Sequence, residues 1–245
     1  MRGTTNFACL TYHLIGEGPS PYVVPEHQLV AQLAFLKAEG YRAEGFEELE
    51  ARITSRQTAP SLYVILTVDD GHESSMRAAD LFEANGLRAT FFLTRDRCEK
   101  KLHFIRPREI RDLRKRGFSL GTHGTTHRKL TFMPEHACVE ELKGSRDWLE
   151  DMIGEKVRYM AAPGGYINHR VLRLARENGY LLTGTCNEWM NSLAALDMPG
   201  TVNRVNIRRH YGLRQFGKIV GGNARFYAWR QIRAAALSLP KQLLR

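Results

Sequence analysis

Two adjacent carboxylates follow an apolar run in the first third of the chain. Residues 62–71 read LYVILTVDDG, so a β-branched and apolar stretch leads into Asp69, Asp70 and Gly71. The stretch predicts a strand that is buried on both faces. Because two neighbouring carboxylates repel each other, a divalent cation would explain the pair: one carboxylate would bind it and the other would stay ionised as a base. A plain Asp-Gly turn is the alternative for this stretch taken alone.

Two histidines offer further ligands for such a cation. His123 and His127 frame the sequence HGTTH, directly after a short strand predicted at 117–121. Histidines four residues apart can face the same way in a helix or tight turn, and imidazole suits zinc and its neighbours. Gly124 stands where the zinc proteases carry their general-base glutamate, so the pattern is not theirs. A third stretch, YMAAPGG at 159–165, predicts a short strand that ends in a glycine-rich turn, where backbone can approach a substrate or simply reverse.

In order and spacing, these stretches resemble the motifs of the polysaccharide deacetylases, the NodB homology domain of carbohydrate esterase family 4. TVDDG at 67–71 is similar to the family's Thr-Phe-Asp-Asp-Gly motif, and HGTTH is similar to its His-Ser/Thr-x-x-His motif apart from Gly124. Residues 161–165 resemble its Arg-x-Pro-x-Gly motif. The opening LTYH at 10–13 and the alanine that replaces the third motif's arginine resemble the branch that deacetylates poly-β-1,6-N-acetylglucosamine and related exopolysaccharides.

The resemblance implies a metal-dependent hydrolase that removes N-acetyl groups from an N-acetylhexosamine polysaccharide or glycan precursor. It assigns one divalent metal, zinc with cobalt or nickel as alternatives, to Asp70, His123 and His127. It makes Asp69 the base that takes a proton from water. The backbone N–H of Gly164 is then the second donor to the oxyanion, by analogy with the residue after the motif proline.

The leaving amine needs a proton, and the resemblance to the exopolysaccharide branch makes His13 its source, with His210 as the alternative. The family's arginine that steadies the base is Ala161 here, and its partner aspartate is missing from TCNEW at 185–189. Arg204 is a candidate replacement from its position in the chain. Trp189 is expected either to line the sugar site or to pack in the core. The other expected substrate-binding residues are Pro163 and Gly165.

The alternation of predicted strands and helices favours an α/β fold with a parallel sheet. The candidate catalytic groups all follow strands, which places them at the C-terminal rim of a (β/α) barrel. By resemblance to the family, the barrel is irregular, with about seven strand–helix units, and it occupies a catalytic domain at 1–211. Helices are predicted at 25–40, 46–53, 76–84, 107–116, 134–153 and 170–178, and strands at 7–13, 62–68, 88–93, 117–121, 157–161, 180–184 and 202–207.

Residues 212–245 are predicted to form a basic C-terminal helical extension. The stretch FYAWRQIR at 226–233 is aromatic, apolar and basic, without acids. It predicts a peripheral contact with an anionic membrane, or alternatively a helix docked on the barrel. The formal net charge of +10 favours anionic partners or reflects a basic solvated surface. No nucleic-acid-binding motif is visible, so an N-acetylated glycan is the expected partner.

The four cysteines lie far apart, which favours reduced, packed thiols. The first residues lack the apolar segment of a signal peptide, so the expected location is cytoplasmic or peripheral to the cytoplasmic face of the membrane. Two alternatives to an active polysaccharide deacetylase remain at this point. One is a catalytically impaired relative that binds glycans, and the other is a membrane-surface protein that acts on a lipid-linked sugar.

Overall fold

One sheet organises the molecule, and a computed structural model describes it for residues 5–238. The strands follow the order β10-β1-β5-β6-β7-β8-β9-β11, with β4 beside β5 and β12 beside β1. Among the described strands of this sheet, every pairing is parallel except that of β1 with β10. The strands are β1 (Asn6–Tyr12), β4 (Arg42–Glu44), β5 (Tyr63–Asp70), β6 (Thr90–Leu93), β7 (Ser119–Thr122), β8 (Tyr159–Ala161), β9 (Leu182–Thr185), β10 (Asn191–Ser192), β11 (Gly200–Asn203) and β12 (Val205–Asn206).

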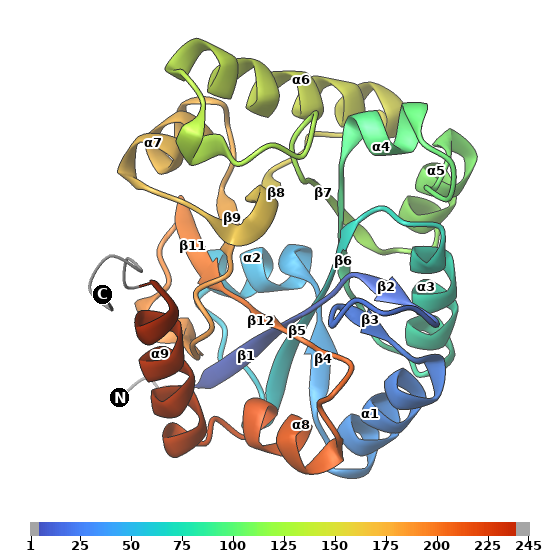
Figure 1. The fold of residues 1–245 in the computed structure, drawn as a ribbon, viewed down its shortest axis with the longest axis vertical. Coiled ribbons are helices and arrows are strands. Elements are labelled where there is room, and N and C mark those ends of the chain that lie inside the picture. Colours follow the sequence, from blue (N-terminus) through green and yellow to red (C-terminus); the bar gives the residue numbers. More distant parts are fainter. Residues whose placement is uncertain (1–4, 239–245) are drawn as a thin grey trace, which may run out of the picture.

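Helices surround this sheet, and a small pair of strands lies beside it (Figure 1). The helices are α1 (Glu26–Ala38), α2 (Phe46–Thr54), α3 (Ser74–Ala84), α4 (Arg95–Lys100), α5 (Pro107–Lys115), α6 (Glu135–Ile153), α7 (His169–Glu177), α8 (Leu213–Val220) and α9 (Ala224–Ser238). Three single turns, η1 (Leu130–Phe132), η2 (Pro163–Gly165) and η3 (Leu193–Ala195), and the strands β2 (Leu14–Ile15) and β3 (Val23–Val24) complete the described elements. The predicted α/β barrel is confirmed by this arrangement.

The sheet closes on itself at Arg204. This residue separates β11, which pairs with β9, from β12, which pairs with β1. The single strand predicted at 202–207 is therefore wrong: the chain leaves one edge of the sheet and joins the opposite edge within one residue. Because both edges are then paired, the sheet forms a nearly closed barrel. The neighbouring strand ends gather at one rim of that barrel (Figure 1).

Alternate strand residues pack into two separate cores. Ala8 and Leu10 of β1 face the large core between the sheet and the outer helices. Phe7 and Cys9 belong to a smaller core with Phe46 of α2, inside the barrel. The same alternation along β5 places residues 63, 65, 67 and 69 on the inner face, because successive strand side chains point to opposite faces. Asp69 therefore continues the inner row of side chains up to the rim.

The predicted C-terminal extension is helical as far as residue 238, where the description ends; residues 239–245 lie outside it. Phe216 of α8 and Tyr227 of α9 belong to the large core of the barrel. The Tyr227 hydroxyl donates to the backbone carbonyl of Ile219 at 3.0 Å, which joins the two helices. Within the described residues, no helix is both long and apolar enough to cross a bilayer.

Candidate active site

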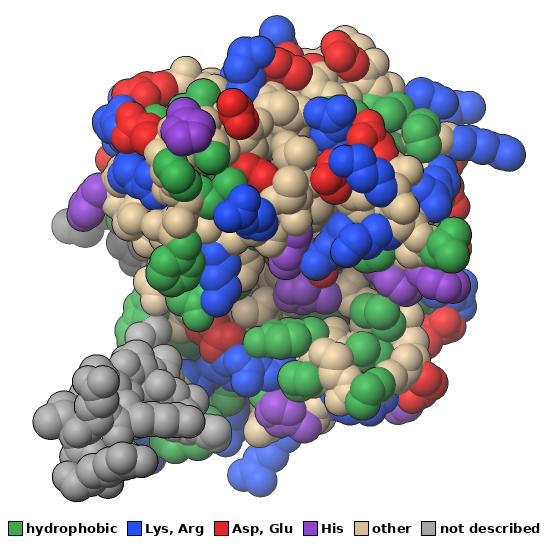
Figure 2. Space-filling model, turned by 45° about the horizontal axis from the view of Figure 1, so that its top comes forward, with side chains coloured by type: hydrophobic (Ala, Val, Ile, Leu, Met, Phe, Trp, Pro, Cys, Tyr) green, Lys and Arg blue, Asp and Glu red, His purple; other side chains and the backbone are tan. Residues whose placement is uncertain are grey.

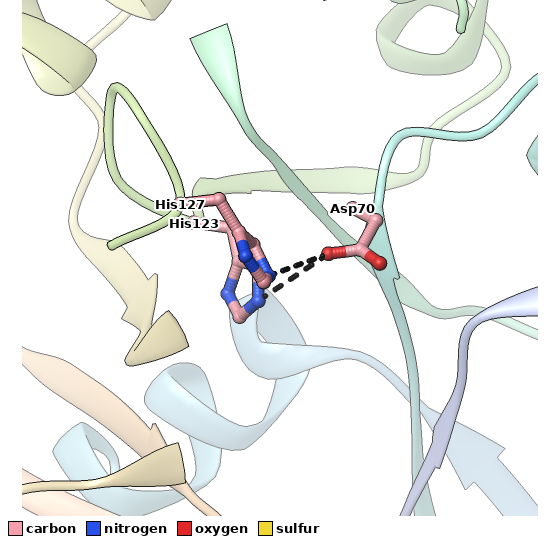
Figure 3. A group of neighbouring side chains, drawn as sticks. All are labelled: Asp70, His123 and His127. Carbon is pink, nitrogen blue, oxygen red and sulfur yellow. Dashed lines mark ion pairs between the residues drawn. The ribbon is translucent and has the colours of Figure 1, made fainter. Parts of the chain in front are cut away.

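Asp70, His123 and His127 converge at the rim of the barrel (Figure 3). The Nε2 atom of His127 lies 3.0 Å from Oδ1 of Asp70, and Nε2 of His123 lies 3.6 Å from the same oxygen. One ligand atom from each residue falls within 4.8 Å of the other two. In Figure 2, histidine side chains lie near the middle of the face that contains this rim. The structure thus brings together all three residues predicted to bind a metal.

Strand order explains this convergence. β5, β6 and β7 are parallel neighbours, so their carboxyl ends meet at one edge. Asp70 ends β5, and His123 directly follows β7. The loop that continues from His123 is held by Glu141 of α6, whose carboxylate accepts hydrogen bonds from the N–H groups of Thr125 and Thr126 at 2.8 and 2.9 Å. This loop places His127 opposite Asp70.

The surroundings of His123 leave its Nε2 atom available to a metal. Nδ1–H of His123 donates to the carbonyl of Ala161 at 2.8 Å, which directs the lone pair of Nε2 toward Asp70. Burial lowers the pKa of His123 to about 4, against the opposing charges of Asp69 and Asp70, so its imidazole is neutral near pH 7. A neutral imidazole is the form that binds a metal.

The donor set fits a divalent metal. Oδ1 of Asp70 is buried and has no hydrogen bond of normal geometry. Burial alone would raise the pKa of Asp70, but the hydrogen bond with His127 and the nearby guanidinium of Arg97 hold it well below its usual range, so the carboxylate is ionised. One carboxylate oxygen and two imidazole nitrogens are ligands that zinc, cobalt and nickel accept. Three protein ligands also leave coordination positions for water and substrate.

Asp69 is held by a buried arginine. The guanidinium of Arg204 donates to both carboxylate oxygens of Asp69, at 2.7 and 2.9 Å, and both side chains are inaccessible to solvent. Nε of Arg204 donates to the carbonyl of Thr185 at 3.2 Å, and its guanidinium lies 5.3 Å from the ring centroid of Phe92. Burial would raise the pKa of Asp69, but Arg204 lowers it below its ordinary value. Asp69 is therefore ionised and fixed in orientation.

The ionised Asp69 adjoins the cluster of metal-ligating groups. Its Oδ2 lies 3.9 Å from Nε2 of His123. One carboxylate thus faces two imidazole nitrogens, while its neighbour is held by a bidentate arginine. This is the arrangement expected of a metal-dependent hydrolase with a separate base. The sequence profile of the polysaccharide deacetylase family matches residues 56–183, just over half of the chain. The protein belongs to this family.

Solved structures of similar proteins support the fold. The deacetylase PplD of Streptococcus pyogenes superposes with a TM-score of 0.80 and 22% identity, covering 89% of this chain and 99% of that one. The de-N-acetylase of Aggregatibacter actinomycetemcomitans gives a TM-score of 0.79 and 16% identity, over 88% and 100% of the two chains. IcaB of Ammonifex degensii gives 0.70 and 22%, over 84% and 88%.

Among proteins of known sequence, YxkH of Bacillus subtilis strain 168 is 24% identical over 172 residues, which is 70% of this chain and 61% of YxkH. The peptidoglycan-N-acetylglucosamine deacetylase of Bacillus cereus is 25% identical over 119 residues, or 48% of this chain and 53% of that protein. The matched region therefore spans less than two thirds of either relative.

The two candidate proton donors of this site lie in different settings. Tyr12 pairs in register with Val68, so His13 stands level with Asp69 on the neighbouring strand end. The ring of His13 lies 5.3 Å from that of Tyr22, and its Nδ1 is buried without a hydrogen-bond partner. His210 is exposed and packs edge-on against Tyr211, with ring centroids 4.7 Å apart. The structure brings His13, rather than His210, next to the base.

The glycine-rich turn borders a cavity of about 700 Å³. Gly164 and Gly165 line it, with φ angles of 67° and 73° that favour glycine. A Cβ atom on Gly165 would lie 2.1 Å from Cβ of Cys186, so no larger residue fits there. Pro163, the first residue of the turn, is buried. The cavity is large enough for a sugar unit, and its lining includes the turn but not Asp70, His123 or His127.

Trp189 lies outside the lining of this cavity and packs against Tyr227 of α9, with ring centroids 5.6 Å apart. Its neighbour Glu188 does line the cavity, and burial raises the pKa of Glu188 to about 7 although Arg208 opposes the shift. Sequence reasoning missed both Glu188 and Arg208 as cavity residues. The only available signal was their closeness in sequence to the degraded TCNEW motif and to β12.

Proposed function

We propose that this deacetylase removes N-acetyl groups from N-acetylhexosamine units of a polysaccharide or glycan precursor, with one divalent metal bound by Asp70, His123 and His127. The observation that carries the proposal is that the two adjacent aspartates at the rim have different partners. Asp70 offers an oxygen to two imidazole nitrogens, while Asp69 is ionised and fixed by Arg204. A glycan-binding relative without catalysis would have no physical need for this arrangement.

The chain's own groups supply the proton transfers. A cation held by Asp70, His123 and His127 would provide Lewis acidity, which would acidify water and polarise the acetyl carbonyl. Asp69 accepts a proton from the attacking water, whose oxygen forms a bond to the acetyl carbon. The backbone N–H of Gly164 donates to the oxyanion that develops. His13 then protonates the nitrogen as the C–N bond breaks, which gives acetate and a free amine.

N-acetylglucosamine polymers are the proposed substrate class. The opening LTYH motif supports an exopolysaccharide, and the name of the Bacillus cereus relative supports an N-acetylglucosamine unit. Zinc is the proposed metal, with cobalt and nickel as alternatives of the same ligand preference. The experiment is acetate release from N-acetylglucosamine oligomers by the metal-stripped protein, repeated after each metal is returned.

Release that requires the metal and is absent in Asp70→Ala would support the proposal. A catalytically impaired protein would bind the metal in stoichiometric amount and release no acetate from any oligomer tested, and that outcome would contradict it. The Arg42→Gln variant serves as a control for nonspecific effects of mutation, because this side chain is 63% exposed and pairs with Glu44, away from the rim.

We further propose that α9 rests on an anionic membrane surface, where a lipid-linked sugar becomes an alternative substrate for the same reaction. Its outward face carries Arg225, Ala228, Trp229 and Ile232, at the spacing of one helix face. Trp229 is 52% exposed and Ile232 is 69% exposed. Residues 213–245 contain seven Lys or Arg residues and no Asp or Glu. Apolar anchors flanked by cations favour a negatively charged lipid interface over a second copy of a chain with net charge +10.

Vesicle co-sedimentation tests this placement. The chain should bind vesicles that contain phosphatidylglycerol, and bind pure phosphatidylcholine much less, because the attraction is partly electrostatic. Replacing both Trp229 and Ile232 by serine should reduce the binding. Phe132→Ser is the matched control, since Phe132 is 76% exposed on η1. Equal vesicle binding by the wild type and the double variant would contradict the proposal. So would a double variant that still binds vesicles but no longer forms a dimer that the wild type forms.

A further inference from the structure

Arg97 reaches the same oxygen of Asp70 that faces the two histidines. Its Nη1 lies 2.6 Å from Oδ1 of Asp70, closer than Nε2 of His127 at 3.0 Å or Nε2 of His123 at 3.6 Å. Arg97 lies on α4, a helix that the sequence pattern did not indicate and that lies outside the three motifs. A cationic side chain therefore occupies part of the space around an oxygen that the proposed function assigns to a divalent metal.

The backbone of α4 is fastened to the ligand loop. The N–H of Arg95 donates to the carbonyl of Gly124 at 3.3 Å, and the N–H of Asp96 donates to that of Thr125 at 2.9 Å. On the other side, a Cβ atom on Gly71 would lie 3.0 Å from Sγ of Cys98, so α4 packs closely against the end of β5. Arg97 cannot move away from Asp70 as part of its helix without disturbing both segments that carry the ligands.

The charges around the rim are balanced before any metal is added. The Arg204 guanidinium offsets Asp69, and the Arg97 guanidinium offsets Asp70. A divalent cation that binds Asp70 must therefore enter beside a positive group that already forms an ion pair with this carboxylate. Like charges a few ångströms apart in a partly buried site repel strongly, because the effective dielectric constant there is well below that of water.

We propose that Arg97 competes with the divalent metal for Asp70, so that it weakens metal binding and stabilises the metal-free protein. The inference rests on the proposed metal site, and it assigns a function to a residue outside the family motifs. The Arg97 side chain has room to yield: it is 21% exposed, and its guanidinium lies 5.6 Å from the ring centroid of Phe104, whose face can hold a cation. The site therefore binds its metal more weakly than the same three ligands would without Arg97.

Metal affinity and metal-free stability together test this role. Zinc is removed from the loaded protein by titration with a chelator of known affinity, which gives the dissociation constant for zinc. This approach also works for a variant that is unstable without metal. Arg97→Gln removes the charge and keeps a polar side chain of similar reach. We expect it to bind zinc at least about tenfold more tightly. The repulsion between two charges this close exceeds the free energy that corresponds to a tenfold change in affinity. The melting temperature of its metal-free form should fall.

Two control variants separate charge from position. Arg97→Lys keeps the positive charge and should stay close to the wild type in both measurements. Arg95→Gln changes an arginine of the same helix that pairs with Glu99 rather than with a ligand, and it should leave zinc affinity unchanged. Weaker or unchanged zinc binding in Arg97→Gln would overturn the inference, because a residue that merely orients Asp70 would lower affinity when removed. If the wild type binds no metal, the proposed function itself fails.

Discussion

Arg204 binds both oxygens of Asp69 from the point at which the barrel closes. The family's third motif normally supplies an arginine next to the base, and this chain has Ala161 in that position. A Cβ atom on Gly184 would lie 2.7 Å from Nε of Arg204, so the glycine of β9 leaves the space through which this side chain reaches Asp69. An arginine between β11 and β12 therefore makes the contact with the base that the family's third motif assigns to an arginine at the position of Ala161.

Removal of this arginine should uncouple metal binding from turnover. We expect Arg204→Gln to keep its zinc and to release acetate about 10–100-fold more slowly, since groups that orient ligands and catalytic residues contribute on this scale. It should also lower the free energy of unfolding by about 3–5 kcal/mol, because Asp69 would be left as an unpaired buried charge. Arg204→Lys should not restore full activity, because lysine cannot make the bidentate contact. Full activity in Arg204→Gln would show that the base does not need this partner.

The two adjacent aspartates should fail in different ways. Asp69→Asn preserves the shape of the side chain and leaves Asp70 in place, so zinc should still bind in stoichiometric amount while turnover falls by about 10²–10⁴-fold, the range typical of a lost general base. Asp70→Ala removes a ligand, so zinc should be lost first and activity with it. Metal content by elemental analysis, measured beside acetate release, distinguishes the two. An active Asp69→Asn enzyme would disprove the assignment of the base.

Acid should destabilise the metal-free protein before it affects ordinary carboxylates. The pKa of His123 is lowered by burial to about 4, whereas the unfolded chain takes up this proton near the ordinary value of 6.5. Between these values the unfolded state binds more protons, so the free energy of unfolding falls as the pH is lowered from about 6.5 to 4. The full effect is about 3 kcal/mol, from the size of the shift. Urea unfolding at several pH values measures it.

Zinc should change this pH dependence in a defined direction. Bound metal excludes the proton from Nε2 of His123, so a zinc-loaded protein should resist acid until the metal itself is released. A His123→Gln variant should lack the decline between pH 6.5 and 4 that is due to this residue. A decline of the same size in that variant would assign the effect to other groups.

The local sequence was sufficient to predict which residues lie at the rim, but not which side chains from other elements contact them. Asp70 and His123 were predictable together because each follows an apolar strand, and parallel neighbours end at the same edge. Asp96 and its neighbours in α4 form a polar helix of only six residues, too short for any hydrophobic period to show. Arg97 was missed for that reason, although it lies nearest to the oxygen of Asp70.

The closure of the barrel was likewise hidden from local patterns. Residues 202–207 alternate like one strand, and nothing in them marks Arg204 as the residue at which pairing changes from β9 to β1. Position along the chain was enough to suggest Arg204 as a partner for Asp69, but its contact spans 135 positions and depends on the closed sheet. For Trp189, position along the chain was misleading. It lies beside the degraded motif at 185–189, but its ring packs against Tyr227 of α9.

The space around Gly124, where this chain departs from the second motif, leads to a final prediction. Its φ angle is 74°, and a Cβ atom there would lie 3.1 Å from Oε2 of Glu141 and 3.3 Å from Cγ of Pro163. Restoring the family's hydroxyl residue with Gly124→Ser should therefore strain the ligand loop, lower the free energy of unfolding by about 1–3 kcal/mol and weaken zinc binding. Thermal unfolding and chelator titration measure the two effects.

Gly154 provides the matched control for that experiment. It ends α6 with a φ angle of 71°, nearly the same as that of Gly124, but no atom lies within 4 Å of the position its Cβ would take. Gly154→Ser therefore carries the backbone strain alone, at about 1–2 kcal/mol, and should leave zinc affinity unchanged because it lies far along α6 from the ligand loop. The difference between the two variants isolates the contact with Glu141 and Pro163. Unaltered zinc affinity in Gly124→Ser would mean that the loop can relax around the new side chain without moving His123 or His127.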